Sequence, residues 1–317
     1  MGSIVSQWQE VTSFVSSSPT KLEIKFENDL KQLLLNQLKG GGYLFNNKAT
    51  VEDVVRQYFN VIFREISIQP RKVHISRELA SRLPTGDLKI AFDKITAIAT
   101  TGGRLNPYLS TELLKPDYKD HLLYDWRIHH LHLGIVADKG DPRFIARTDN
   151  LLYVRVEPND FYCIDILDHD PINGFANKQL IEILHRNWRQ LMAQHRFSIL
   201  PQPAGNLTNQ EIDQVRQANL LVFISVSDGT AYMPTGGGYA TDGSSIAVTR
   251  KSDMLLSRLY DLEEAIKNDE ANIRNHIAQA IGRCPRTIKI KLKSWDESGV
   301  FALEKKTNTE LKFPWIG

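Results

Sequence analysis

The chain of 317 residues has few of the features that mark secreted, metal-binding or membrane-spanning proteins. It contains only two cysteines, Cys163 and Cys284, and their spacing does not resemble that of metal-binding thiolates. No uninterrupted apolar run approaches the roughly 18 residues that a membrane span requires. The N-terminus lacks the charged start and apolar core of a secretory signal. These absences predict a protein without a membrane span that acts in a reducing, cytoplasmic compartment.

A strong net charge of either sign is also absent. The chain carries 39 Lys and Arg against 37 Asp and Glu, which gives a net charge of +2. This balance argues against a protein dominated by nucleic-acid electrostatics, although it allows a local basic patch. The most basic segment is 286–312, where alternation predicts a strand with Lys289, Lys291 and Lys293 on one face. These lysines would either contact nucleic-acid phosphates or protect a sheet edge from association.

Apolar periodicity predicts an α+β fold in three parts. Residues 1–110 form a helical N-terminal region, in which 20–38 has clear helical spacing. Residues 111–200 form a central domain with an antiparallel sheet flanked by helices. Residues 201–317 form a C-terminal α/β region, in which the apolar run 220–226 predicts a buried strand.

The histidines concentrate in the central part, where four of the nine lie within 124–170. Strands are predicted over 126–133, 151–156 and 161–167, and the last two flank the turn at 157–160. Both faces of this hairpin carry apolar side chains. The sheet is therefore expected to be covered on both sides.

The turn also predicts the register of the hairpin, which places Thr148 opposite His169. His132, at the end of the neighbouring strand, would reach the same rim together with Arg147 and Asp149. Histidine titrates near neutral pH, and arginine can stabilise a developing phosphorane charge. A rim with these residues suits general acid–base chemistry.

The order of His132, Asp149, Leu151-Leu152 and His169 resembles the core of RelE/YafQ-type bacterial ribonuclease toxins, over about fifty residues. The resemblance implies cleavage of RNA without a metal or cofactor, often on the ribosome, with the ribose 2′-OH as nucleophile. It implies that His132 and His169 share the general base and acid roles, while Asp149 orients or assists. RNA, rather than DNA, is the implied nucleic-acid partner, and a protein antitoxin is a further possible partner.

The chain departs from the family pattern at several positions. Asp165 stands where the family has an arginine, four residues before the last histidine, and Asn150 replaces an aromatic residue. The loop that precedes Asp149 is also longer. Arg147 or Arg155 is a candidate replacement for the missing positive charge.

Other interpretations of the histidines remain open. His130 and His132 share a strand face and, with 168–170, could ligate a metal in a metal-dependent hydrolase, although no spaced motif such as HExxH supports this. The histidines could instead be structural, in a non-enzymatic nucleic-acid-binding or interaction component of a defence system. The strand lysines and the Gly-rich loop 233–245 would then make the contacts.

One predicted helix, over 177–194, adds candidate phosphate contacts. Its basic residues Arg186 and Arg189 either bind nucleic acid near the histidines or belong to a solvated face. The leading hypothesis is a cytoplasmic, metal-independent endoribonuclease of the toxin or phage-defence type, and it assigns no residue to a metal.

Overall fold

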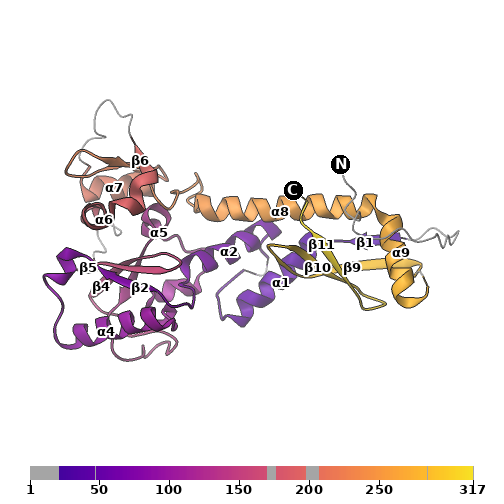
Figure 1. Cartoon of the computed structure of the whole chain (residues 1–317), viewed down its shortest axis with the longest axis horizontal. Coiled ribbons are helices and arrows are strands. Elements are labelled where there is room, and N and C mark those ends of the chain that lie inside the picture. The colour runs from indigo at the N-terminus through magenta and orange to yellow at the C-terminus, as the bar shows by residue number, and fades with distance from the viewer. Residues whose placement is uncertain (1–20, 47, 170–175, 198–206, 284, 317) are drawn as a thin grey trace. The chain divides into compact units, whose positions relative to one another are not determined.

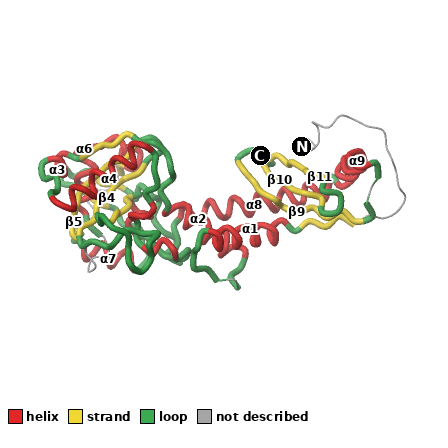
Figure 2. Tube along the Cα trace, turned by 90° about the horizontal axis from the view of Figure 1, so that it is seen from below, coloured by secondary structure: helices red, strands yellow, loops and turns green. Residues whose placement is uncertain are grey.

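The computed structural model describes residues 21–46, 48–169, 176–197, 207–283 and 285–316. Cys284 and Asp170 lie outside them. In the described residues the fold is α+β, as predicted, with mixed sheets flanked by helices (Figures 1 and 2). The chain divides into two compact units. Unit 1 comprises 1–58 and 251–317, and unit 2 comprises 59–250.

Long-range strand pairing produces this division, which differs from the three predicted parts. The predicted boundaries after residues 110 and 200 both lie inside unit 2, and the second falls in 198–206, outside the described residues. β2 (Lys72–Ile75), from the part predicted to be helical, pairs in parallel with β5 (Asp160–Asp168) of the central sheet. In unit 1, β1 (Lys21–Ile24) pairs in parallel with β9 (Thr287–Asp296), which joins the two chain segments of that unit.

The sheet of unit 2 has the strand order β2-β5-β4-β3, with β3 at Ile128–His132 and β4 at Asn150–Val156. β3, β4 and β5 are antiparallel, as predicted, and β2 adds to β5 in parallel. Every residue of β3 is buried, as are the middles of β4 and β5. α4 (Gly86–Thr101) lies on one side of the sheet and α6 (Lys178–Trp188) on the other (Figure 1). The expected cover on both faces is therefore present.

The remaining elements of unit 2 are short. They are α3 (Arg77–Ala80), α5 (His121–Trp126), α7 (Asn209–Gln217), the 3₁₀ helices η1 (Asn106–Tyr108), η2 (Thr111–Leu114) and η3 (Arg189–His195), and a small sheet of β6 (Arg196–Phe197), β8 (Ala231–Tyr232) and β7 (Ile224–Ser225). The predicted strand over 220–226 is wrong except at β7. The backbone N–H of Leu220 donates to the Val215 carbonyl as the chain leaves α7, and Leu220 and Leu221 are exposed.

Unit 1 contains a sheet of order β1-β9-β10-β11, with β10 at Gly299–Glu304 and β11 at Thr309–Pro314. Its helices are α1 (Phe26–Gly40) and α9 (Glu270–Ile281), together with parts of α2 (Val51–Arg64) and α8 (Ile246–Asn268), which both cross the division between the units. The predicted helix over 20–38 is wrong at its start, because pairing with β9 makes 21–24 a strand. The helix begins at Phe26.

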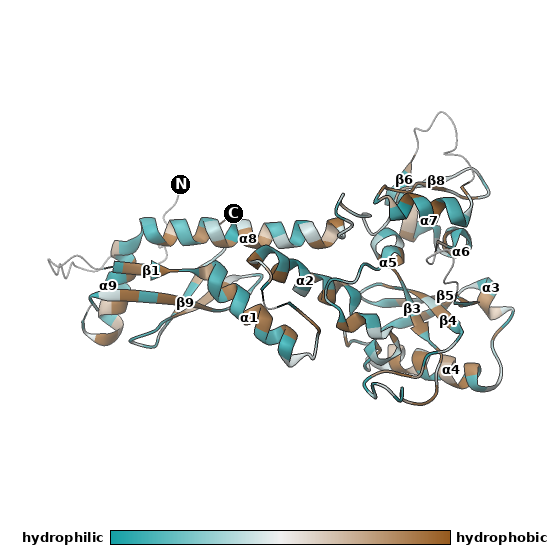
Figure 3. Cartoon of the chain, turned by 180° about the vertical axis from the view of Figure 1, so that it is seen from behind, coloured by the Kyte–Doolittle hydropathy of each residue, from teal (hydrophilic) through white to brown (hydrophobic). Residues whose placement is uncertain are grey.

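Burial alternates along β9. Ile288, Ile290 and Leu292 are buried, whereas the lysines between and beyond them are at least partly exposed, and the alternation is visible in the hydropathy (Figure 3). α1 contacts the buried side, where the carboxylate of Asp29 accepts the backbone N–H of Leu292. β9 lies between β1 and β10 as far as Ile290, so Lys289 is not on a sheet edge. Lys291 and Lys293 lie beyond the pairing with β1, and protection of a sheet edge stays an interpretation for these two lysines.

Candidate active site

A cavity of about 430 Å³ lies in unit 2 at the rim of its sheet. It brings together the four residues that the sequence proposed as catalytic: His132, Arg147, Asp149 and His169. Sequence reasoning missed most of the remaining lining residues, which are Ser110, Glu112, Tyr118, His130 and Thr148.

A β-bulge in β5 determines which residue faces His169. Near the turn the predicted register holds, with Val154 opposite Cys163. Beyond it Tyr153 lies opposite Asp165, so Ile164 is an extra residue and the pairing shifts by one. The backbone N–H of His169 consequently donates to the carbonyl of Asp149, at 2.5 Å. The predicted pairing of His169 with Thr148 is wrong by this one residue.

The shift places Asp149 and His169 as cross-strand neighbours at the open end of the hairpin. Such neighbours have Cβ atoms roughly 5 Å apart and project to the same face. Both residues are exposed, whereas His130 and His132 are buried in the wall of the cavity. The cavity therefore has a buried imidazole wall and a solvent-accessible rim.

His132 is held in its neutral form. Burial lowers the pKa of His132 to about 4, and positive charge on His130 or Arg147 acts in the same direction. Its Nδ1 accepts the backbone N–H of Thr148 at 3.3 Å. Because Nδ1 is the acceptor, the proton of the neutral ring is assigned to Nε2.

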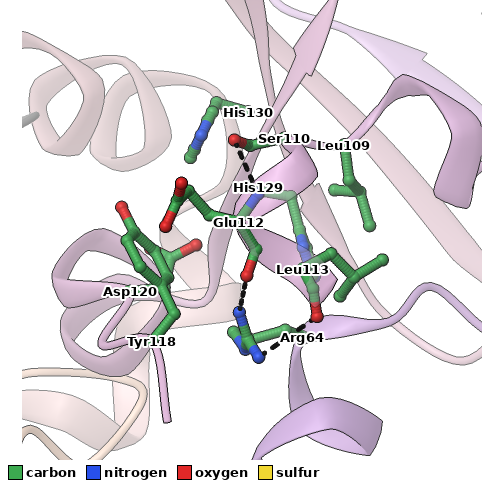
Figure 4. A pocket seen from close by; sticks show the side chains of 9 residues that line it. All are labelled: Arg64, Leu109, Ser110, Glu112, Leu113, Tyr118, Asp120, His129 and His130. Carbon is green, nitrogen blue, oxygen red and sulfur yellow. Dashed lines mark hydrogen bonds between the residues drawn. The ribbon is translucent and has the colours of Figure 1, made fainter. Parts of the chain in front are cut away.

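Two further histidines extend this wall. Burial lowers the pKa of His130, and burial lowers the pKa of His129 to about 4. His129 and His130 line a smaller cavity of about 20 Å³ that shares Ser110, Glu112 and Tyr118 with the larger one (Figure 4). Histidines at adjacent positions of one strand project to opposite faces, as predicted, yet both reach this region because β3 is an edge strand.

The segment after η1 supplies the other side of the cavity. Burial raises the pKa of Tyr118 to about 12, and the negative charges of Asp120 and Glu112 raise it further. The Tyr118 phenol therefore keeps its proton at neutral pH. Arg64 fixes this segment, because its guanidinium donates to the backbone carbonyls of Glu112 and Leu113 (Figure 4) and also to that of Lys115. The sequence held no signal for this placement, because it depends on packing between distant segments.

Arg147 lies at the exposed rim and is tied to the same segment. Its Nη2 donates to Thr111 Oγ1 at 2.8 Å and to Ser110 Oγ at 3.5 Å. Both acceptors are neutral, so the guanidinium charge is available to an anion in the cavity.

The ends of the long loop between β3 and β4 are closely packed. A Cβ at Gly134 would lie 2.3 Å from the carbonyl oxygen of Ala146, so only glycine fits there. Thr148 Oγ1 accepts the backbone N–H of Leu133 at 2.9 Å and donates to the carbonyl of Asn150 at 2.7 Å. These contacts position Arg147, Thr148 and Asp149 although the loop is long.

The other predicted contact residues lie elsewhere. Arg155 is buried, ion-pairs with Glu157 at 2.8 Å and does not line the cavity, so it does not replace the arginine of the toxin family. Asp165, at that family position, is buried and ion-pairs with Arg82.

Arg186 and Arg189 are about half exposed and ion-pair with Glu78 and Asp228 respectively. Neither lines the cavity. Lys289, Lys291 and Lys293 belong to unit 1.

The metal interpretation of the histidines finds no support in the described ranges, where no group of three or more His, Cys, Asp or Glu side chains is placed to hold a metal ion. Among the helices of the same ranges, none combines the length and the apolar character needed to cross a bilayer. In comparisons with known proteins, no family model, curated protein or solved structure matches this chain.

Proposed function

We propose that the cavity of unit 2 is the centre of a metal-independent endoribonuclease. The observation that carries the proposal is the meeting of two histidines, an arginine and an aspartate at one solvent-accessible cavity. Cleavage by this route needs a base for the ribose 2′-OH, an acid for the leaving oxygen and positive charge near the phosphate. The cavity holds a group suited to each of these tasks.

The reaction would follow an in-line displacement at phosphorus. His169, oriented by Asp149, takes the proton from the 2′-OH as the bond between O2′ and phosphorus forms. The bond from phosphorus to the 5′ oxygen breaks, which leaves a 2′,3′-cyclic phosphate and a 5′-OH. Arg147 stabilises the charge on the non-bridging oxygens during this step.

The pKa of His132 changes the role that the toxin resemblance implies for it. With a pKa of about 4, only about one His132 in a thousand is protonated at pH 7, so it is a poor general acid. Its Nε2–H instead donates a hydrogen bond to the phosphate. Tyr118, which keeps its proton, supplies the proton to the leaving 5′ oxygen.

The partner and setting follow from the same proposal. The substrate is RNA, which alone carries the 2′-OH. An enzyme that cleaves cellular RNA requires an inhibitor, so the proposal includes a protein antitoxin. The setting that we propose is the cytoplasm, where the enzyme would act as an effector of toxin or phage-defence type.

The test is cleavage of RNA by the purified full chain in the presence of EDTA. His169→Ala is expected to lower the rate by roughly 10²- to 10⁴-fold, as for loss of a general base. The matched control is His74→Gln, which removes a histidine of the same sheet that hydrogen-bonds to Asp160 and does not line the cavity. Undiminished cleavage by His169→Ala would overturn the residue assignment, and loss of wild-type cleavage in EDTA would overturn the metal-independent mechanism.

A further inference from the structure

One face of the sheet in unit 1 is open to solvent and rich in lysine. We call it the lysine face. It carries Lys21 and Glu23 on β1, Lys289, Lys291, Lys293 and Asp296 on β9, Phe301 and Leu303 on β10, and Glu310 and Lys312 on β11.

The strand register places these side chains together. Lys291 lies opposite Leu303, which lies opposite Glu310 on the far strand. Phe301 lies opposite Lys312. Lys293 occupies the irregularity where the pairing of β9 with β10 shifts. Because Ile288, Ile290 and Leu292 occupy the other face, the lysines lie on the side away from the core.

The lysine face is electropositive, since it holds five lysines against two glutamates and Asp296 and thus has a net charge of +2. The glutamates neutralise part of it: Lys289 ion-pairs with Glu23 at 2.7 Å, and Lys293 approaches Glu310 at 3.5 Å. Lys291 and Lys312 add positive charge on either side of β10.

An aromatic ring lies among these charges. Phe301 is partly exposed, and the Lys312 ammonium lies 5.1 Å from the centre of its ring. Leu303 beside it is also partly exposed. The exposed part of this ring and its aliphatic neighbour offer a surface on which a planar base can stack.

We propose that the lysine face binds single-stranded nucleic acid, with its lysines on the phosphates and a base stacked on Phe301. Lys289 and Lys291 are two residues apart on the same face of β9, so their Cα atoms are roughly 6.7 Å apart along the strand. This spacing is close to the length of one extended nucleotide. A duplex fits less well because its bases are stacked inside the helix and leave no face free for Phe301. The binding is independent of the chemistry proposed for the cavity of unit 2.

The test measures fluorescence anisotropy of a labelled 2′-O-methyl oligouridine on the full chain. This probe lacks the free 2′-OH and resists the proposed cleavage, so binding is measured apart from it. The combined variant Lys291→Gln, Lys293→Gln, Lys312→Gln is expected to weaken binding by at least about tenfold and to reduce the slope of log K against log[salt] by about 2. Phe301→Leu, which keeps an apolar side chain, is expected to weaken binding by roughly five- to 100-fold.

The matched control carries the same charge change on exposed or partly exposed lysines of the same unit outside its sheet: Lys31→Gln, Lys39→Gln, Lys48→Gln. The affinity of this control variant for the oligouridine should lie within about twofold of the wild-type affinity. Its lysines would attract the probe only at long range, and salt screens that attraction. Equal losses in both triple variants, duplex binding as tight as single-strand binding, or no binding by the wild type would overturn the inference. RNA cleavage without binding at the lysine face would support the proposed function and contradict this inference. Binding at the lysine face without RNA cleavage would support this inference and contradict the proposed function. Thermal unfolding checks that each variant is folded.

Discussion

The two four-stranded sheets of this protein expose different surfaces. In unit 2 all five residues of β3 are buried, and the sheet has cover on both faces. In unit 1 burial alternates along β9, so one face packs against helices and the other meets solvent. Both sheets contain a parallel pair joined to antiparallel strands, and the difference between them lies in what covers them.

Whether helices cover a sheet face determines whether its ionisable side chains are charged. Under two layers, ionisable groups are neutral or paired: burial keeps His129 and His132 uncharged, and Asp165 ion-pairs with Arg82. On the open face of unit 1, lysines remain charged in water. Unit 2 therefore offers a cavity with a wall of neutral histidines for proton transfer, whereas unit 1 offers an open charged face for contact with an extended polyanion.

The largest expected effect that tests this comparison is the pH dependence of stability. The pKa of His129 and of His132 falls to about 4 in the folded chain, from about 6.5 when unfolded. The unfolded chain therefore binds more protons between these values, so stability is complete above pH 6.5 and is lost as the pH falls toward 4. Each histidine is expected to contribute about 3 kcal/mol, measured by hydrogen exchange of the β3 and β4 amides against pH.

The sheet of unit 1 supplies the internal control. Burial acts to raise the pKa of Glu304, but hydrogen bonds from the backbone N–H groups of Lys289, Thr307 and Lys306 outweigh it and lower the pKa. Stability from Glu304 is present above its unfolded pKa of about 4.5 and is lost only as the pH falls below that value. Loss of protection in both sheets over one and the same pH range would contradict the comparison. His129→Gln should flatten the response of unit 2 alone.

A smaller effect on stability is expected at Thr148, where the long loop between β3 and β4 ends. Thr148→Val removes the hydroxyl that bonds the backbone of Leu133 and Asn150, and Leu133 is buried. The unpaired backbone groups should lower the free energy of unfolding by about 1–3 kcal/mol, measured in urea. Thr148→Ser keeps the hydroxyl and should recover most of this loss. Equal stability of the valine variant and the wild type would show that the hydroxyl does not hold the wall of the cavity.

The sequence predicted what depends on local pattern. The hairpin β4–β5 and the clustering of His132, Asp149 and His169 follow from periodicity and from the turn at 157–160. The bulge at Ile164 was not predictable, because an extra residue in one strand has no signature of its own in an apolar run. The local pattern predicts a helix over β1, because the strand depends on its partner β9, which lies more than 250 residues away.

The candidate site shows the same limit. The sequence indicates His132, Asp149 and His169, since the pairing of the strands brings them to the same end of the sheet. Ser110, Glu112 and Tyr118 were missed because Arg64, from α2, fixes their segment through backbone carbonyls. The charge of Arg155 makes it a candidate for the missing arginine, but its ion pair with Glu157 and its burial depend on tertiary packing.

The smallest expected effect concerns the charge of the open face. Glu23 ion-pairs with Lys289 at 2.7 Å and with Lys21 at 3.1 Å, so Glu23→Gln frees both lysines and raises the net charge of the lysine face by one. Binding of the oligouridine probe at low salt should tighten by about two- to fivefold, and the gain should disappear near 1 M salt, where the screening length is about 3 Å. Glu27→Gln makes the same charge change on α1, away from the lysine face, and serves as the control. An equal gain from both substitutions would mean that the overall charge of the chain, rather than the lysine face, attracts the polyanion. The open sheet of unit 1 would then have no binding role to set against the cavity of unit 2.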